Sequence, residues 1–109
     1  MYTPRKGDLV ALTFDPQAGH EQRGRRPALV VSNDLFNRHT GLCVVCPVTS
    51  ARRDFPFHVP LPDDCGVRGV AMVEQVKSVD FRARGAKRIG VAPDGVMDEV
   101  LALLDACLY

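Results

Sequence analysis

Short apolar runs separated by polar turn residues fill most of the chain, and their spacing predicts strands. Four runs stand out: 7–14 (GDLVALTF), 28–32 (ALVVS), 42–50 (LCVVCPVTS) and 70–76 (VAMVEQV), of which the last becomes polar toward its end. The continuous apolar run at 28–32 is typical of a central strand. Pro47 cannot donate a hydrogen bond to a ladder, so we expect a bulge or a strand end there.

Three weaker patterns add smaller elements. The alternating segment 57–61 (FHVPL) predicts an edge strand, with Pro60 as the edge marker. The segment 33–41 (NDLFNRHTG) begins with an Asn or Asp cap candidate and ends at a glycine, so it predicts a short helix or a turn. The basic segment 77–90 (KSVDFRARGAKRIG) predicts a hairpin.

From Pro93 onward the pattern becomes helical, since proline suits the first turn of a helix. An amphipathic stripe recurs at helical spacing. It consists of Val96, Val100, Leu103 or Leu104, and Cys107. A second apolar edge is available for a partner, and it consists of Met97, Leu101, Leu104 and Leu108.

Together these patterns give five to seven short strands, a minor helical turn and one C-terminal helix. That order predicts a mainly β fold of the α+β kind, a small and strongly bent barrel with a C-terminal α-helix packed on it. The chain has 109 residues and no internal repeat or linker, so we expect a single domain over 1–109.

Composition narrows the class of protein. With 46% hydrophobic and 25% charged residues the chain is globular, and its net charge of +1 gives it no global basic field. A polyanionic partner must therefore meet a local concentration of charge. The start of the chain has no signal-peptide core and no apolar run approaches ~18 residues, so we expect a cytoplasmic protein without a membrane span.

The four cysteines favour buried thiols over a metal site. Cys43 and Cys46 are three positions apart in a predicted strand, which places them on opposite faces. Zinc-binding pairs normally sit in a turn and need a second pair, and Cys65 and Cys107 do not supply one. We expect no metal and no cofactor.

Basic residues gather in three places, each near the end of a predicted strand. These are Arg23, Arg25 and Arg26 beside Glu21; Arg52 and Arg53 after Thr49 and Ser50; and Lys77, Arg82, Arg84, Lys87 and Arg88. In a small barrel these strand ends can converge, and clustered guanidinium groups suit phosphate. The alternative for each cluster alone is a solvated surface with weak ion pairs.

Two of these residues have a second interpretation. Glu21 and Arg26 fit either a salt bridge that fixes the turn or an acid–base group beside an electrostatic clamp. Thr49 at its strand end fits either a local backbone cap or a hydroxyl that takes part in chemistry.

Three motifs in order then carry a resemblance that covers nearly the whole chain. GDLVALTFDPQAGHEQRGRRPALVVSND, CPVTS and EQVKSVDFRARG together resemble the MazF/PemK-like family, ribosome-independent mRNA-cleaving toxins of toxin–antitoxin pairs. The resemblance implies an SH3-like barrel with a C-terminal helix, usually a homodimer. It implies metal-independent cleavage of single-stranded RNA at a short sequence to 2′,3′-cyclic phosphate and 5′-hydroxyl ends. It also implies a cognate antitoxin whose acidic tail occupies the RNA site.

The resemblance also implies roles for particular residues. The catalytic set is Glu21, Arg26 and Thr49, and the RNA-binding set is Gln22, Ser50, Lys77, Phe81 and Arg84. Glu21 fits a base, and Thr49 fits a hydrogen-bond donor to the phosphate. Arginine stays protonated in proteins, so Arg26 fits electrostatic stabilisation better than proton transfer.

Two positions depart from the pattern of the family. His20 stands where relatives often carry a small hydroxyl residue, and it either shares proton transfer or sits in solvent. Phe81 stands where many relatives carry tryptophan, and it either stacks on a base or belongs to the core.

Two other functions stay open at this point. A CcdB-like, non-enzymatic toxin that poisons DNA gyrase would use the same barrel and rely on the C-terminal helix. An inactive RNA-binding barrel would keep the arginines and lose turnover. The segments EQRGRRP and PVTS favour the nuclease.

Overall fold

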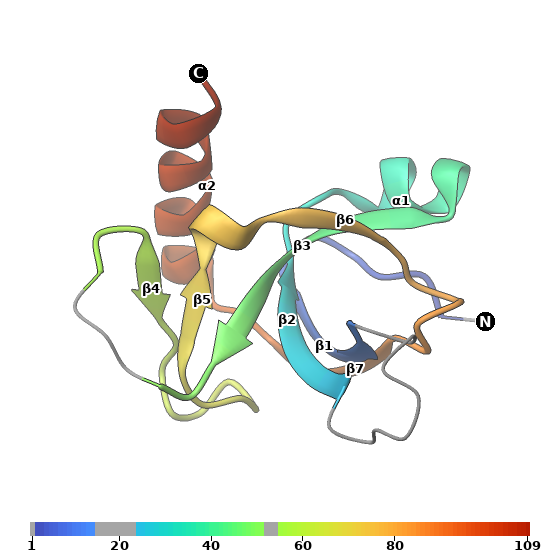
Figure 1. The fold of residues 1–109 in the computed structure, drawn as a ribbon, viewed down its shortest axis with the longest axis horizontal. Helices are drawn as coiled ribbons and strands as arrows, with labels where there is room; N and C mark the ends of the chain where they lie inside the picture. The colour runs from blue at the N-terminus through green and yellow to red at the C-terminus, as the bar shows by residue number, and fades with distance from the viewer. Residues whose placement is uncertain (1, 15–23, 52–54) are drawn as a thin grey trace.

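A bent antiparallel sheet and a C-terminal helix make up the structure, a computed structural model that describes residues 2–14, 24–51 and 55–109 (Figure 1). The elements in chain order are β1 (Asp8–Thr13), β2 (Arg25–Val30), α1 (Asp34–Thr40), β3 (Leu42–Thr49), β4 (His58–Pro60), β5 (Val70–Met72), the 3₁₀ helix η3 (Val73–Gln75), β6 (Lys77–Asp80), β7 (Lys87–Val91) and α2 (Asp94–Leu108). The mainly β fold with a C-terminal helix is confirmed.

The short helix α1 forms for the reason that its sequence indicates. Asn33 caps its start, since the Asn33 side chain accepts a hydrogen bond from the backbone N–H of Phe36 at 2.9 Å. Gly41 ends the helix with a φ of 74°, a left-handed conformation that glycine adopts without steric cost.

Strand β3 pairs with more strands than any other in the sheet. The strand order is β4-β5-β3-β2-β1-β7, and β6 also pairs with β3. One edge of β3 pairs with β2, and the other edge pairs first with β6 and then with β5. Pro47 lies at the change of partner, between Val45, which pairs with β6, and Val48, which pairs with β5. The expected bulge or strand end at Pro47 is therefore wrong: the strand continues, because the missing N–H falls where no ladder partner is required.

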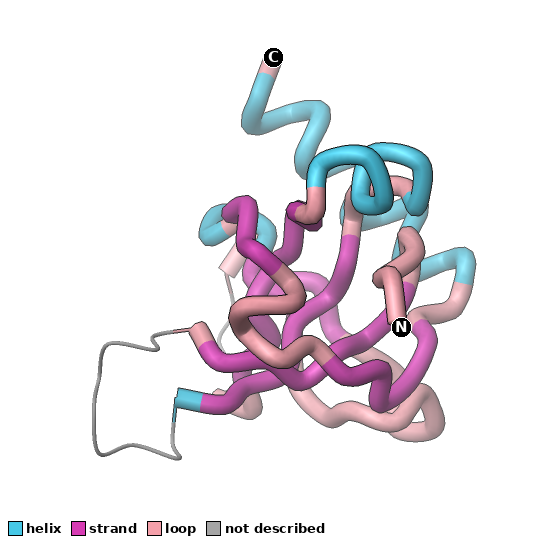
Figure 2. Tube along the Cα trace, turned by 90° about the vertical axis from the view of Figure 1, so that its right-hand side faces the viewer, coloured by secondary structure: helices cyan, strands magenta, loops and turns pink. Residues whose placement is uncertain are grey.

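The backbone of the turn at Cys65 and Gly66 lies directly against the backbone of β7 at Gly90. The turn before β5 passes over β7, and a Cβ atom on Gly90 would lie 2.1 Å from the carbonyl oxygen of Cys65. Only glycine fits at such a contact, so the sequence encodes the approach directly. Figure 2 shows the strands curling around one another, with both helices at the upper side of the molecule, as in Figure 1.

The basic segment 77–90 is not a hairpin, so that prediction is wrong. It does contain two strands, but β6 pairs with β3 and β7 pairs with β1. The turn between them carries the chain from one wall of the barrel to the other. Phe81, at the start of the turn, is only 2% exposed and anchors it in the core. The segment 70–76 also differs, because the strand stops at Met72 and continues as η3.

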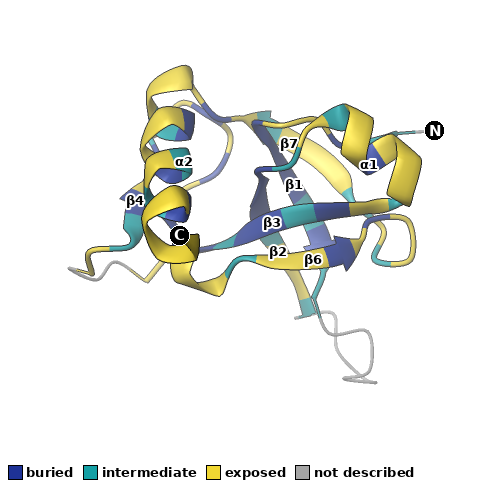
Figure 3. Cartoon of the chain, turned by 90° about the horizontal axis from the view of Figure 1, so that it is seen from above, coloured by how far each residue is buried: buried dark blue, intermediate teal, exposed yellow. Residues whose placement is uncertain are grey.

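Apolar side chains form two cores, one on each face of β3. The core inside the barrel consists of Val10, Leu12, Ala28, Val30, Cys43, Val45, Val79 and Phe81. The other core lies beneath α2 and includes Leu9, Leu29, Cys46, Val59, Val73 and Val100. Figure 3 shows that β3 is mostly buried or half-buried, while the outer face of α2 is exposed.

Helix α2 buries a stripe that is rotated from the predicted one. Its buried residues are Met97, Val100 and Leu104, whereas Val96 is half-buried and Cys107 is exposed. The helix packs on η3 and β4, which the periodicity alone does not locate. Met97 and Leu104 are therefore core residues and not part of a free edge for a partner.

Cys43, Cys46 and Cys65 are buried as predicted, whereas the prediction is wrong for Cys107, which is exposed because the buried stripe of α2 is rotated away from it. All four are free thiols in the described residues. Cys43 belongs to the core inside the barrel and Cys46 to the core beneath α2, so they point to opposite faces of β3. Burial raises the pKa of each thiol from about 9 to about 12. Thiols that stay protonated are poor nucleophiles and poor metal ligands.

The described ranges lack both a metal-binding cluster and a membrane-spanning helix. No group of three or more His, Cys, Asp and Glu side chains is placed to hold a metal ion within 2–14, 24–51 and 55–109. Within the same ranges, no helix has the length and apolar character needed to cross a membrane.

Candidate active site

Arg26 lies in β2, near the end of the barrel where that strand begins. It pairs with Leu12 of β1 and shares the strand face of Ala28 and Val30, both of which are buried inside the barrel. Arg26 itself is exposed. The strand therefore carries the guanidinium past the core, on the inward-facing side of the sheet.

Thr49, the last residue of β3, belongs to the same face of the sheet. It follows Cys43, Val45 and Pro47 at alternate positions, and the first two are buried inside the barrel. Strands β2 and β3 pair as Ala28 with Pro47, and that register, continued by two residues, brings Arg26 opposite Thr49. The sheet thus directs both predicted catalytic residues to one place.

The local environment of Thr49 shows the predicted cap, and the role of its hydroxyl in chemistry stays a prediction. Its Oγ1 accepts a hydrogen bond from the backbone N–H of Ala51 at 3.2 Å, which is the expected cap. The hydroxyl keeps its own hydrogen, so it can still donate to a ligand. Gly69 flanks this position closely, since a Cβ there would lie 2.1 Å from the Thr49 carbonyl oxygen. Ser50, which follows, is exposed.

Lys77, the first residue of β6, reaches the end of β1 from the other side. Its Nζ lies 5.2 Å from the centroid of the Phe14 ring, within cation–π distance. The Phe14 backbone N–H donates to the Gly24 carbonyl at 3.0 Å, so this contact lies beside the start of β2. Lys77 and Arg26 therefore approach the same end of the barrel.

Arg25 and Arg84 form a clamp between the β6–β7 turn and the ends of β1 and β2. Arg25 donates to the carbonyl oxygens of Arg84 at 3.3 Å and Gly85 at 2.6 Å. Arg84 donates through one nitrogen to the carbonyl oxygens of Thr13, at 3.0 Å, and Phe14. Arg25, which we expected to face solvent or RNA, thus holds protein backbone, and so does Arg84.

Several predicted residues fall outside the described ranges. These are His20, Glu21, Gln22, Arg23, Arg52 and Arg53. The choice for Glu21 between a salt bridge and a base stays a prediction, as does the RNA contact of Gln22.

The predicted stacking of a base on Phe81 is wrong. The ring is 2% exposed and packs in the core inside the barrel, so neither face is open to a nucleobase. Of the two interpretations drawn from the sequence, the core position holds. The sequence alone does not show whether an aromatic residue at the start of a turn faces the core or the solvent.

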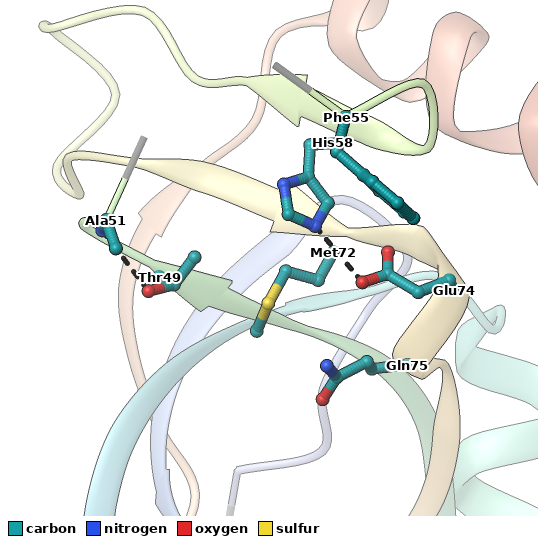
Figure 4. A pocket seen from close by; sticks show the side chains of 7 residues that line it. All are labelled: Thr49, Ala51, Phe55, His58, Met72, Glu74 and Gln75. Atoms are coloured by element: carbon teal, nitrogen blue, oxygen red, sulfur yellow. Dashed lines mark hydrogen bonds and ion pairs between the residues drawn. The ribbon is translucent and has the colours of Figure 1, made fainter. Parts of the chain in front are cut away.

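Sequence reasoning missed a pocket between the end of β3 and the strands β4 and β5. Its volume is about 320 Å³. The lining side chains are Thr49, Ala51, Phe55, His58, Met72, Glu74 and Gln75 (Figure 4). Nε2 of His58 lies 3.1 Å from Oε2 of Glu74, and the Phe55 and His58 rings pack with their centroids 4.9 Å apart. The signal for the pocket was a polar pair, Glu74 and Gln75, at the end of an apolar run.

The described part of the site is therefore strongly cationic, although the chain has a net charge of only +1. Arg25, Arg26, Lys77 and Arg84 converge around the ends of β1 and β2, and Glu74 is the acidic residue in the neighbouring pocket. Such a concentration of cations beside a hydroxyl and a pocket suits a phosphodiester with an attached base.

Comparisons with known proteins agree with this chemistry. Residues 5–108 match the sequence model of a family described as the PemK-like, MazF-like toxin of type II toxin–antitoxin systems. The endoribonuclease toxin MazF of Escherichia coli strain K12 is 46% identical over 94 residues, which cover 85% of this chain and 84% of that protein. The endoribonuclease PemK of Escherichia coli is 44% identical, and the match covers 94% of this chain and 80% of PemK.

Solved structures share the fold. A crystal structure of MazE-MazF from Deinococcus radiodurans superposes with a TM-score of 0.91 at 48% identity, covering 99% of this chain and 97% of the other. A crystal structure of MazF from the same organism gives a TM-score of 0.89 at 48% identity, with coverages of 99% and 98%.

Proposed function

Since the chain belongs to the family of PemK-like, MazF-like toxins of type II toxin–antitoxin systems, we propose that it is an endoribonuclease toxin. It cuts single-stranded RNA at a short sequence, without a metal ion. The observation that carries this proposal is the placement of Arg26 and Thr49 on one face of the sheet, beside Lys77, at a cationic end of the barrel.

The reaction is an internal transfer at phosphorus. The 2′-oxygen of the RNA attacks the neighbouring phosphorus and the bond to the 5′-oxygen breaks, which leaves a 2′,3′-cyclic phosphate and a 5′-hydroxyl. A base takes the proton of the 2′-hydroxyl, and a proton is delivered to the departing 5′-oxygen. Negative charge builds on the phosphoryl oxygens in between, and fixed donors aimed at it lower the barrier.

Each described residue has a part that suits its chemistry. Arg26 stabilises the developing charge with a planar fork of donors, and it stays charged throughout. The Thr49 hydroxyl donates to a non-bridging oxygen, while Lys77 and Ser50 bind the RNA backbone. Glu21 is the candidate base, with His20 as the alternative for proton transfer, and Gln22 adds an RNA contact.

A cognate antitoxin is the second partner. The relative from Deinococcus radiodurans with a TM-score of 0.91 was crystallised as MazE-MazF, and this chain shares 48% of its residues. A segment rich in Asp and Glu would be complementary to the cationic end of the barrel and would exclude RNA from it.

The chain acts as a homodimer in this proposal. The apolar strand around 43–48 contributes its side chains to the two cores, so it offers no free apolar surface for a dimer. The support now comes from apolar residues that are still exposed, Leu35 at 57%, Phe36 at 40% and Leu108 at 61%. Light scattering that shows a monomer at micromolar concentration would contradict the dimer.

Purified protein incubated with a long single-stranded RNA in EDTA tests the function. Discrete cuts with 5′-hydroxyl ends are expected. Intact RNA together with stalled DNA gyrase would favour the CcdB-like alternative, and RNA that is bound but intact would favour an inactive RNA-binding barrel.

A further inference from the structure

We propose that His58 and Glu74 determine which nucleobase is accepted beside the scissile bond, with bases that carry an exocyclic amino group preferred over uracil. The inference rests on the proposed ribonuclease function and adds a specificity-determining pair to it. It starts from the pocket of about 320 Å³ that neither Arg26 nor Lys77 lines.

The pocket has the position and the surfaces that a base requires. Its volume lies within the usual range of small-molecule sites, about 300–1,000 Å³. Thr49 lines it, so a base bound there belongs to a nucleotide adjoining the phosphate that Thr49 contacts. Phe55, which also lines the pocket, is 45% exposed, and its ring is available for stacking on a base.

The acidic side chain in the pocket has one fixed oxygen. Oε2 of Glu74 lies 3.1 Å from Nε2 of His58, whose side chain is 6% exposed, whereas the Glu74 side chain is 31% exposed. An ionised carboxylate only accepts hydrogen bonds, so Nε2 of His58 carries the hydrogen of this contact. The packed imidazole cannot swing away, and it therefore holds the carboxylate in one orientation.

The other oxygen of Glu74 then selects the base. In Figure 4 it is drawn on the side of the Phe55 ring, without a dashed line to His58, and it too can only accept. Adenine, cytosine and guanine each carry an amino group that donates, whereas uracil has a carbonyl oxygen in the place of the cytosine amino group. An acceptor facing a carbonyl oxygen is left unpaired, so uracil is disfavoured.

The burial of His58 indicates more than a surface ion pair. Its Nδ1 is buried and makes no hydrogen bond within the described residues. A polar atom left without a partner costs free energy, and such atoms are few in folded proteins. A histidine at this position is explained if its Nε2 orients the carboxylate of Glu74, since that contact compensates for the unpaired Nδ1.

The test maps cleavage sites in a randomised RNA library by sequencing 5′-hydroxyl ends. Wild-type protein is expected to disfavour uracil at one position of its site by roughly tenfold or more, the effect of one charged hydrogen bond. Glu74→Gln replaces an acceptor by a donor in nearly the same shape, and it should abolish or reverse that preference at this position alone.

His58→Leu should relax the same preference, since the carboxylate loses its fixed orientation. His58→Gln, whose amide nitrogen can replace Nε2 as a donor, should restore it in part. His39→Gln is the matched control, because His39 is exposed on α1, and it should leave every position unchanged. Thermal unfolding of each variant checks that the chain is folded.

The outcomes separate the two proposals. RNA cut by wild type, with the same base preferences in Glu74→Gln and His58→Leu, overturns the specificity role and leaves the ribonuclease in place. If wild type tolerates uracil at every position of its cleavage site, the specificity role is likewise overturned and the ribonuclease stays in place. RNA left intact by wild type overturns the proposed function and this inference with it.

Discussion

Arg25 and Arg26 are neighbours in β2, and their side chains belong to opposite faces of the strand. Arg25 holds the carbonyl oxygens of the β6–β7 turn, where it meets Arg84, which holds the end of β1. Arg26 is exposed, and the register of β2 and β3, continued by two residues, brings it opposite Thr49. Arg25 therefore has an architectural contact, whereas Arg26 has, in our proposal, the task of binding a phosphate.

The comparison predicts that changes at the two arginines separate activity from stability. Arg26→Lys keeps the charge but loses the fork of donors, and we expect cleavage to fall about 100-fold or more, as for the loss of an oxyanion donor. The melting temperature should stay close to that of wild type, because Arg26 is exposed. Single-turnover cleavage of a fixed RNA measures the cleavage rate. A rate close to that of wild type would exclude bidentate binding of the phosphate by Arg26.

The converse change is Arg84→Ala, which removes donors to two carbonyl oxygens at the end of β1. We expect a loss of about 2 kcal/mol in the free energy of unfolding, from charge-assisted hydrogen bonds that join distant segments. Urea denaturation measures it. Arg88→Ala, an exposed position on β7, is the control and should cost little. Unchanged stability in Arg84→Ala would mean that the clamp does not support the turn.

Thr49 sharpens the comparison, since it combines both tasks in one side chain. Thr49→Ser keeps the acceptor for Ala51 and the donor for RNA, and it should retain most activity. Thr49→Val loses both, and we expect cleavage to fall about 10-fold and stability by about 1 kcal/mol. Cleavage kinetics and urea denaturation of the two variants distinguish the effect of losing the hydroxyl from the effect of changing the shape of the side chain. Equal activity in both variants would contradict a role for the hydroxyl.

The last prediction concerns the cores that support both arginines, and it appears only at alkaline pH. Because burial raises the pKa of Cys43 and Cys46 to about 12, the folded state holds protons that the unfolded state releases above pH 9. Stability is therefore fully present below pH 9 and falls as the pH rises from 9 toward 12, by at most about 1.4 kcal/mol per pH unit for each thiol.

Urea denaturation at pH 8 and pH 10 measures this slope. Cys46→Val should reduce it, whereas Cys107→Ser, a change at an exposed cysteine whose charge only adds to the effect of burial on Cys46, should reduce it much less. A slope that both variants share with wild type would show that other groups cause it.

The sequence predicted the strands, the capped short helix, the C-terminal helix and the burial of Cys43, Cys46 and Cys65, because each depends on local periodicity or capping; it did not predict that Cys107 is exposed. It failed where partners are distant in sequence. Nothing local reveals that β6 and β7 pair with different strands, or that α2 turns Met97 inward. The candidate site divides in the same way. The roles of Arg26 and Thr49 come from strand ends and motif and stay a prediction, whereas the burial of Phe81 and the contact of His58 with Glu74 depend on tertiary packing.

The role of Arg26 in a metal-independent ribonuclease is tested when wild type and Arg26→Lys are incubated with one long single-stranded RNA in EDTA and the new 5′ ends are identified. We expect discrete cuts with 5′-hydroxyl ends for wild type and about 100-fold slower cutting for the variant, at equal melting temperatures. Cuts with 5′-phosphate ends, cutting that EDTA abolishes, or RNA left intact by wild type would contradict it.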